Sequence, residues 1–123
     1  MTQRTPKKSK LERDLEGKPK IILKEFEKIA VHMPTQEEYN TLMQVLECGG
    51  QRWLGGDLPT QNDYWNTYRE ETCIDAENKF QFCDKKFYHR KKYKVISTQK
   101  FYNEQSITLE NIDEINKWFE ENA

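Results

Sequence analysis

Four apolar residues in the first half of the chain repeat at the spacing of one helical face: Tyr39, Leu42, Met43 and Leu46. Thr35 stands where an N-cap belongs, and Glu38 completes a capping box with it. The pair Gly49-Gly50 follows the last apolar position and supplies the left-handed conformation on which many helices end. The pattern therefore predicts an amphipathic helix over residues 36–48.

A second helical pattern lies near the end of the sequence. Its apolar stripe is formed by Leu109, Ile112, Ile115 and Phe119. Thr108 is a suitable N-cap, so we predict a helix over residues 109–121. Before it, Ser97 or Thr98 is expected to cap a short helical turn that carries two aromatic residues.

Shorter segments alternate apolar and polar residues, which is the period of a strand with one buried face. Residues 20–33 predict a strand that enters the core. Residues 71–76 and 79–83 predict the two strands of a hairpin, and residues 93–96 a further strand. Residues 84–92 are interpreted as a basic loop or sheet edge.

Three further features predict turns. Residues 51–56 are interpreted as a short strand that ends at a glycine turn. Thr60 and Asp63 have capping-box spacing and predict a short helical turn. Glu77-Asn78 is expected to form the tip of the hairpin, because asparagine tolerates a positive φ.

The order of these elements indicates an α+β fold, with a small antiparallel sheet covered by helices on one side. We do not expect parallel pairing, because most connections between consecutive strands are too short for a crossover. Residues 1–20 are polar and basic and are predicted to form an N-terminal arm, while residues 21–123 form a single domain.

Composition narrows the class of protein. Hydrophobic residues make up 35% and charged residues 33% of the 123 residues, so the core is small and depends on its aromatic side chains. No apolar run reaches the ~18 residues of a membrane span, and the N-terminus lacks the apolar stretch of a signal peptide. The three cysteines have no tight spacing, which makes a disulfide scaffold unlikely and favours a reducing cytosol.

The formal net charge of −1 conceals strong local asymmetry. Residues 85–100 contain seven lysines and arginines and no acidic residue. Within this stretch, cations alternate with aromatic residues, a pattern that suits phosphate contacts combined with stacking on unpaired bases. The candidate binding residues are Lys85, Lys86, Tyr88, Arg90, Lys91, Lys92, Tyr93 and Lys94.

The acidic segments allow the opposite interpretation. The last predicted helix carries five acidic residues, Glu110, Asp113, Glu114, Glu120 and Glu121, which together could imitate a phosphate backbone. The net charge of −1 is small for a dedicated mimic, and a solvated helix face explains the same residues. The sequence leaves open which of the two faces makes a contact.

The sequence contains little that indicates a catalytic site or a metal site. Cys73, Cys83 and His89 are candidate zinc ligands, but they lack the paired short spacings of structural zinc sites. The glycine pairs lack the lysine and the strand-to-helix setting of a phosphate loop. We therefore expect no catalytic residue, no metal and no cofactor, and interpret the protein as a binding protein rather than an enzyme.

Several motifs resemble those of small uncharacterised proteins encoded by bacteriophages and prophages of Gram-positive bacteria. The resemblance spans roughly residues 29–102 and is carried by His32-Met33-Pro34-Thr35-Gln36-Glu37-Glu38-Tyr39, Gly49-Gly50-Gln51-Arg52-Trp53, Gly55, Glu71-Thr72-Cys73-Ile74 and Val95-Ile96-Ser97. These motifs are structural, so the resemblance implies a phage origin and supplies no catalytic residues. Phage accessory proteins of this kind often bind host machinery, and anti-CRISPR and other anti-defence proteins are the best-known group.

Together these observations lead to one leading hypothesis and two alternatives. The leading hypothesis is a non-catalytic phage-type protein that binds and inhibits a host defence nucleoprotein, most plausibly a CRISPR effector nuclease. The first alternative is a small nucleic-acid-binding protein that uses residues 85–94. The second is a binder of a signalling nucleotide.

Overall fold

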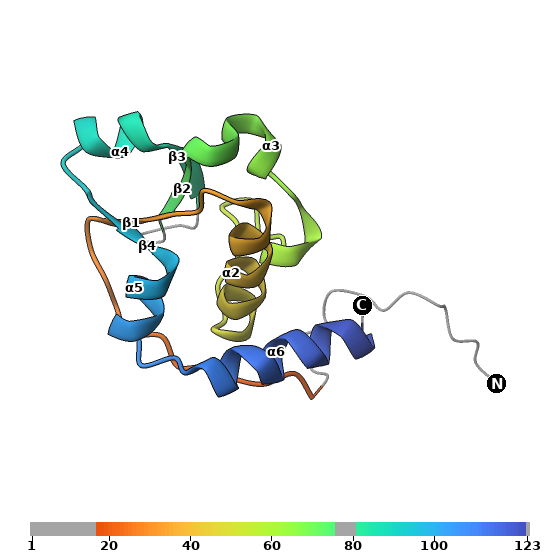
Figure 1. Cartoon of the computed structure of the whole chain (residues 1–123). Coiled ribbons are helices and arrows are strands. Elements are labelled where there is room, and N and C mark those ends of the chain that lie inside the picture. The colour runs from red at the N-terminus through yellow and green to blue at the C-terminus, as the bar shows by residue number, and fades with distance from the viewer. Residues whose placement is uncertain (1–16, 76–80, 123) are drawn as a thin grey trace.

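The structure of the chain is a computed structural model, and it describes residues 17–75 and 81–122 (Figure 1). It contains a sheet and several helices, and the predicted α+β class is confirmed. The elements are β1 (Ile29–His32), α2 (Gln36–Cys48), η1 (Pro59–Gln61), α3 (Trp65–Tyr68), η2 (Arg69–Glu71), β2 (Thr72–Asp75), β3 (Gln81–Asp84), α4 (Lys85–Arg90), β4 (Lys94–Ser97), α5 (Thr98–Glu104) and α6 (Leu109–Asn122). Within the described residues, no helix combines the length and apolar character that crossing a membrane requires.

The four strands form one mixed sheet in the order β3-β2-β1-β4. The predicted hairpin is confirmed, because β2 and β3 pair antiparallel, while its tip at Glu77-Asn78 lies outside the described residues. The expectation of a purely antiparallel sheet is wrong, because β1 and β4 pair in parallel. That expectation considered only consecutive strands, whereas α2, β2, β3 and α4 all lie between β1 and β4 along the chain.

Helices pack on both faces of this sheet. On one face, Val31, Ile74 and Ile96 join the larger core cluster, to which α2, α5 and α6 contribute their apolar stripes. On the other face, Ala30 and Cys73 pack with Tyr88 of α4. The predicted one-sided cover therefore describes the larger core, and α4 adds a second layer that the sequence pattern did not indicate (Figure 1).

The predicted helix over residues 36–48 is confirmed as α2. The Thr35 side chain accepts a hydrogen bond from the backbone N–H of Glu38 at 3.1 Å. The left-handed residue after the helix is Gly50, with φ of 84°, whereas Gly49 has φ of −86°. At Gly49 a Cβ would lie 2.5 Å from Cδ1 of Leu23, so a larger residue there would force the Leu23 side chain to move.

The helix caps in the second half of the chain are also as predicted. Ser97 caps α5, where its Oγ accepts from the backbone N–H of Lys100 at 3.0 Å. Thr108 caps α6 through a reciprocal pair of hydrogen bonds, in which Asn111 supplies both the backbone donor and the side-chain acceptor. Asparagine therefore fills the position that glutamate or glutamine takes in the usual capping box.

Three local predictions are wrong. Residues 84–92 contain a helix, α4, because the Asp84 side chain caps it by accepting from the backbone N–H of Phe87 at 2.9 Å. Residues 51–56 contain the predicted glycine turn, closed by a 2.7 Å hydrogen bond from Gly56 N to Trp53 O, but no strand precedes it. Thr60 does not pair with Asp63, because its hydroxyl donates to the buried carboxylate of Glu47 at 2.5 Å instead.

Candidate functional site

The predicted cations gather on α4 and on the short connection to β4. Five of them are exposed, and we call these five the basic surface: Lys86, Arg90, Lys91, Lys92 and Lys94. Lys85 lies at the start of α4 and is half-buried. The connection between α4 and β4 is held at both ends, since Tyr93 N donates to Tyr88 O of α4 at 2.9 Å and Lys94 N donates to Lys28 O, just before β1, at 2.7 Å. The cations are therefore held on a rigid scaffold.

The aromatic residues of the same stretch do not share this exposure. Tyr88 has no exposed surface, and its hydroxyl donates to Asp75 Oδ2 at 2.6 Å. Burial, together with this hydrogen bond, raises the pKa of the Tyr88 hydroxyl. The prediction that Tyr88 is a binding residue is therefore wrong, because its side chain belongs to the core.

Phe87 and Tyr93 are half-buried and pack against the ring of Tyr88, with centroid separations of 5.1 Å in both pairs. Each also carries a cation on its ring: Lys28 Nζ lies 4.9 Å from the centroid of Tyr93, and Lys91 Nζ 5.8 Å from that of Phe87. The two rings thus make cation–π contacts with Lys28 and Lys91. No ring in this stretch stands free as a platform for an unpaired base.

Lys86, Arg90, Lys92 and Lys94 form no salt bridge with any residue that the structure describes. The acidic helix α6 lies at the opposite end of the molecule from α4, and its five acidic side chains are exposed (Figure 1). The exposed cations of the basic surface and the five acidic side chains of α6 therefore lie apart in the described structure.

The candidate zinc ligands are only partly brought together. Cys73 and Cys83 face each other directly across β2 and β3, and His32 of β1 stands opposite Cys73 on the other side. His89 lies on the exposed side of α4. The His32 ring instead contacts the backbone oxygen of Glu70 at 2.6 Å, and no group of three potential ligands converges anywhere in residues 17–75 and 81–122.

The thiols also lack the character of nucleophiles. Burial raises the pKa of Cys73, and likewise that of Cys48, from 9.0 to about 12. A thiol is reactive as its thiolate, which is scarce at neutral pH when the pKa is this high. The side chain of Cys83 is half-buried and its Sγ lies 3.9 Å from the Tyr68 hydroxyl. Cys73 and Cys83 are therefore packing residues of the sheet.

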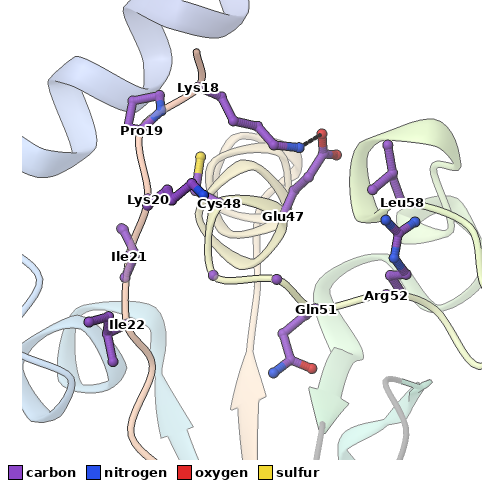
Figure 2. A pocket seen from close by; sticks show the side chains of 12 residues that line it. Lys18, Pro19, Lys20, Ile21, Ile22, Glu47, Cys48, Gln51, Arg52 and Leu58 are labelled. Carbon is purple, nitrogen blue, oxygen red and sulfur yellow. Dashed lines mark hydrogen bonds and ion pairs between the residues drawn. The ribbon is translucent and has the colours of Figure 1, made fainter. Parts of the chain in front are cut away.

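Glu47 is a buried charged residue whose role sequence reasoning missed. Its side chain has no exposed surface; Oε2 is bridged by Lys18 Nζ at 3.2 Å, and Oε1 accepts from the backbone N–H of Thr60 (Figure 2). A sequence signal existed, because Glu47 falls four residues after Met43 on the apolar stripe of α2. This network joins the described end of the predicted arm, Lys18–Lys20, to the body of the domain.

Comparison with the models of known protein families, with curated proteins and with solved structures gives no match to this chain.

Proposed function

We propose that this protein is a non-catalytic binding protein that docks on a nucleic-acid-handling defence complex of a host cell and inhibits it. The observation that carries the proposal is the basic surface, where exposed cations stand on a fixed helix and strand without acidic neighbours in residues 85–100. Such a surface attracts a polyanion and releases the counterions bound to it. The nucleic acid held by a nucleoprotein complex presents a polyanion of this kind.

The packing of the aromatic rings favours phosphate contacts over base stacking. Single-strand binders place exposed aromatic faces beside their cations, and each stacked base contributes about 1–3 kcal/mol. Here the ring of Tyr88 is fully buried, and those of Phe87 and Tyr93 pack on it. Contact with the phosphate backbone therefore requires no rearrangement of the core.

The finer identity of the target rests on the resemblance to phage accessory proteins. An anti-defence role, and a CRISPR effector nuclease as the target, follow from that resemblance and from the need for a partner that exposes nucleic acid. The protein would then act in the cytoplasm of the host. The residues that we assign to the contact are Lys85, Lys86, Arg90, Lys91, Lys92 and Lys94, with Tyr93 supporting them.

The experiment is capture of partners by the tagged full-length chain from lysates of bacteria that carry a CRISPR effector, with and without nuclease treatment, followed by a cleavage assay with the purified effector. We expect one effector complex to be recovered in both samples and its cleavage to fall in proportion to added protein. Arg90→Ala/Lys91→Ala/Lys92→Ala should weaken inhibition. Recovery without any effect on cleavage by that complex would contradict the proposal.

A matched control variant changes the net charge by the same amount as the triple variant in the basic surface. Lys20→Ala/Lys100→Ala/Lys117→Ala removes the same number of exposed cations outside the basic surface. It should inhibit like the unaltered protein. Equal losses in both triple variants would mean that net charge, and not this surface, governs the contact.

One alternative has an observation in its favour. Since the cations of the basic surface have no salt-bridge partners among the described residues, they are also available to free nucleic acid. A nucleic-acid-binding protein without a protein target would lose its partners when the lysate is treated with nuclease. The capture experiment therefore separates the two functions.

A further inference from the structure

Two cysteines stand side by side on adjacent strands of the sheet. Cys73 of β2 is the direct partner of Cys83 of β3 in the antiparallel register. Directly opposite residues of an antiparallel pair project from the same face, with Cβ atoms about 4.5–5.5 Å apart. Cys73 belongs to the small core cluster with Ala30 and Tyr88, and Cys83 packs against that cluster. The fold therefore places the two thiols next to each other on the face that α4 covers.

The spacing of such a pair suits a disulfide bond. A disulfide joins Cα atoms that are about 4.4–6.8 Å apart. Antiparallel partners have Cα separations of about 5.5 Å where they exchange backbone hydrogen bonds and about 4.5 Å where they do not, so either case fits. The Cβ atoms of a disulfide are only about 3.5–4.5 Å apart, so the two strands must approach slightly to form it. Because that compression makes the bond easier to reduce, the pair suits a reversible bond.

The two thiols differ in their access to solvent. Cys73 has no exposed surface, whereas Cys83 is half-buried. The Cys83 thiol meets the Tyr68 hydroxyl at 3.9 Å, a long contact that a reagent can displace. A small reagent from solution therefore reaches Cys83 first, and Cys73 reacts only with a neighbour inside the protein.

Burial slows the second thiol without preventing its reaction. It raises the pKa of Cys73 to about 12, so little thiolate is present at neutral pH. Attack by Cys73 on a modified Cys83 is intramolecular, however, and the high effective concentration of a neighbouring group offsets the scarcity of its reactive form. Exchange at this pair should therefore be slow but complete.

The third cysteine lies elsewhere. Cys48 ends α2 and belongs to the larger core cluster, on the face of the sheet to which Ile74 contributes. Cys73 precedes Ile74 on β2, so its side chain projects from the opposite face. The sheet thus separates Cys48 from the pair.

We propose that Cys73 and Cys83 form a reversible dithiol–disulfide site that reacts with a low-molecular-weight disulfide such as glutathione disulfide. The Cys83 thiolate attacks one sulfur of glutathione disulfide, which forms a mixed disulfide and releases one glutathione thiolate. The Cys73 thiolate then attacks the sulfur of Cys83 and releases the second glutathione. The two cysteines lose two electrons and two protons, and the two glutathione molecules take them up. The site goes beyond the proposed function, since neither cysteine belongs to the basic surface.

The test is incubation of the folded full-length chain with glutathione disulfide at mildly alkaline pH, followed by acid quenching, intact mass measurement and peptide mapping without reduction. We expect a product that lacks two hydrogen atoms, carries no glutathione, and yields one peptide pair joined through Cys73 and Cys83. The thiols that titrate after unfolding should fall from the three of the sequence to that of Cys48 alone. Excess reduced glutathione should restore both thiols.

Variants separate this route from simple accessibility of one thiol. Cys73→Ala removes the second thiol, so Cys83 should accumulate the mixed disulfide with glutathione. Cys48→Ala should form the bond as fast as the unaltered protein. A mixed disulfide that persists at Cys83 in the unaltered chain, a bond that includes Cys48, or no reaction at either strand cysteine would overturn the proposal. None of these results bears on inhibition by the basic surface.

Discussion

The Tyr88 hydroxyl donates a 2.6 Å hydrogen bond to Oδ2 of Asp75, and this bond fastens α4 to the middle of the sheet. Tyr88 has no exposed surface and Asp75 is 2% exposed, so the bond is made in the interior. Asp75 lies on β2, a central strand, while Tyr88 lies on α4, the helix that carries Lys86 and Arg90 of the basic surface. A core interaction thus sets the position of the candidate contact residues.

The first prediction concerns this bond. Tyr88→Phe removes the donor and leaves the carboxylate of Asp75 with one hydrogen bond fewer in a buried place. Hydrogen bonds to charged groups contribute about 1.5–3 kcal/mol, so we expect a loss of that size in the free energy of unfolding, measured with urea. Tyr68→Phe is the control, because among the described residues its hydroxyl is hydrogen-bonded only by the Cys83 thiol, at the long distance of 3.9 Å. Equal stability of the two variants would show that the Tyr88–Asp75 bond contributes little.

The second prediction concerns the core of α2. Leu42 and Leu46 are 0% and 3% exposed and lie in the larger cluster. Leu42→Ala and Leu46→Ala should each lower the free energy of unfolding by about 2–5 kcal/mol, because a cavity remains where the side chain was. Asn40→Ala changes an exposed position of the same helix and should have a small effect. Losses below about 0.5 kcal/mol at both leucines would contradict the packing of α2.

The third prediction concerns metal. Purified protein should contain no stoichiometric zinc, and a chelator should leave its melting temperature unchanged. The measurement is metal content by mass spectrometry after dialysis, together with thermal unfolding with and without chelator. A retained equivalent of zinc would bring Cys73 and Cys83 back as ligands, with His32 or His89 as the third.

The fourth prediction concerns pH. Burial raises the pKa of Cys48 and Cys73 from 9.0 to about 12, and that of Tyr39 from 10.0 to about 12. Because the folded pKa values lie above the unfolded ones, the neutral forms favour the fold, and this stability is present below about pH 9. It should be lost as the pH rises from about 9 to 12. Cys48→Ala/Cys73→Ala should flatten the decline when the free energy of unfolding is followed against pH.

Alkylation checks the same thiols independently. At pH 8, iodoacetamide should label the half-buried Cys83 before the buried Cys48 and Cys73, because the reaction needs an accessible thiolate. Peptide mass spectrometry gives the order of labelling. Early labelling of Cys73 in the folded protein would contradict its burial under α4.

The fifth prediction concerns salt. Near ~0.15 M salt the isolated protein should bind duplex DNA or RNA only weakly, with a dissociation constant above about 1 μM, because under the proposed function these cations would form only part of the contact with a protein target. At lower salt, Arg90→Ala/Lys91→Ala/Lys92→Ala should flatten the log–log salt dependence on duplex DNA by about two to three. The triple variant at Lys20, Lys100 and Lys117 is the control. Submicromolar binding by the isolated chain would favour the nucleic-acid-binding alternative.

The sequence by itself determined the elements that local contacts define. Thr35 and Glu38 start α2, Ser97 starts α5, and Thr108 starts α6, and each cap joins residues three positions apart. The apolar stripes and the strand alternation likewise repeat within a few residues. Such patterns can be recognised from the sequence alone, because the interacting residues are near neighbours along the chain. The cations of residues 85–94 were identified in the same way.

The tertiary structure decided what depends on distant partners. The parallel pairing of β1 with β4, the burial of Tyr88 under its bond to Asp75, and the bridge from Lys18 to Glu47 each join segments that the sequence separates. The sequence pattern around a tyrosine that is flanked by lysines is the same whether its ring stacks on a base or is buried in the core. Only the fold fixes which face of α4 meets the sheet, because burial depends on surfaces that other segments bring to it.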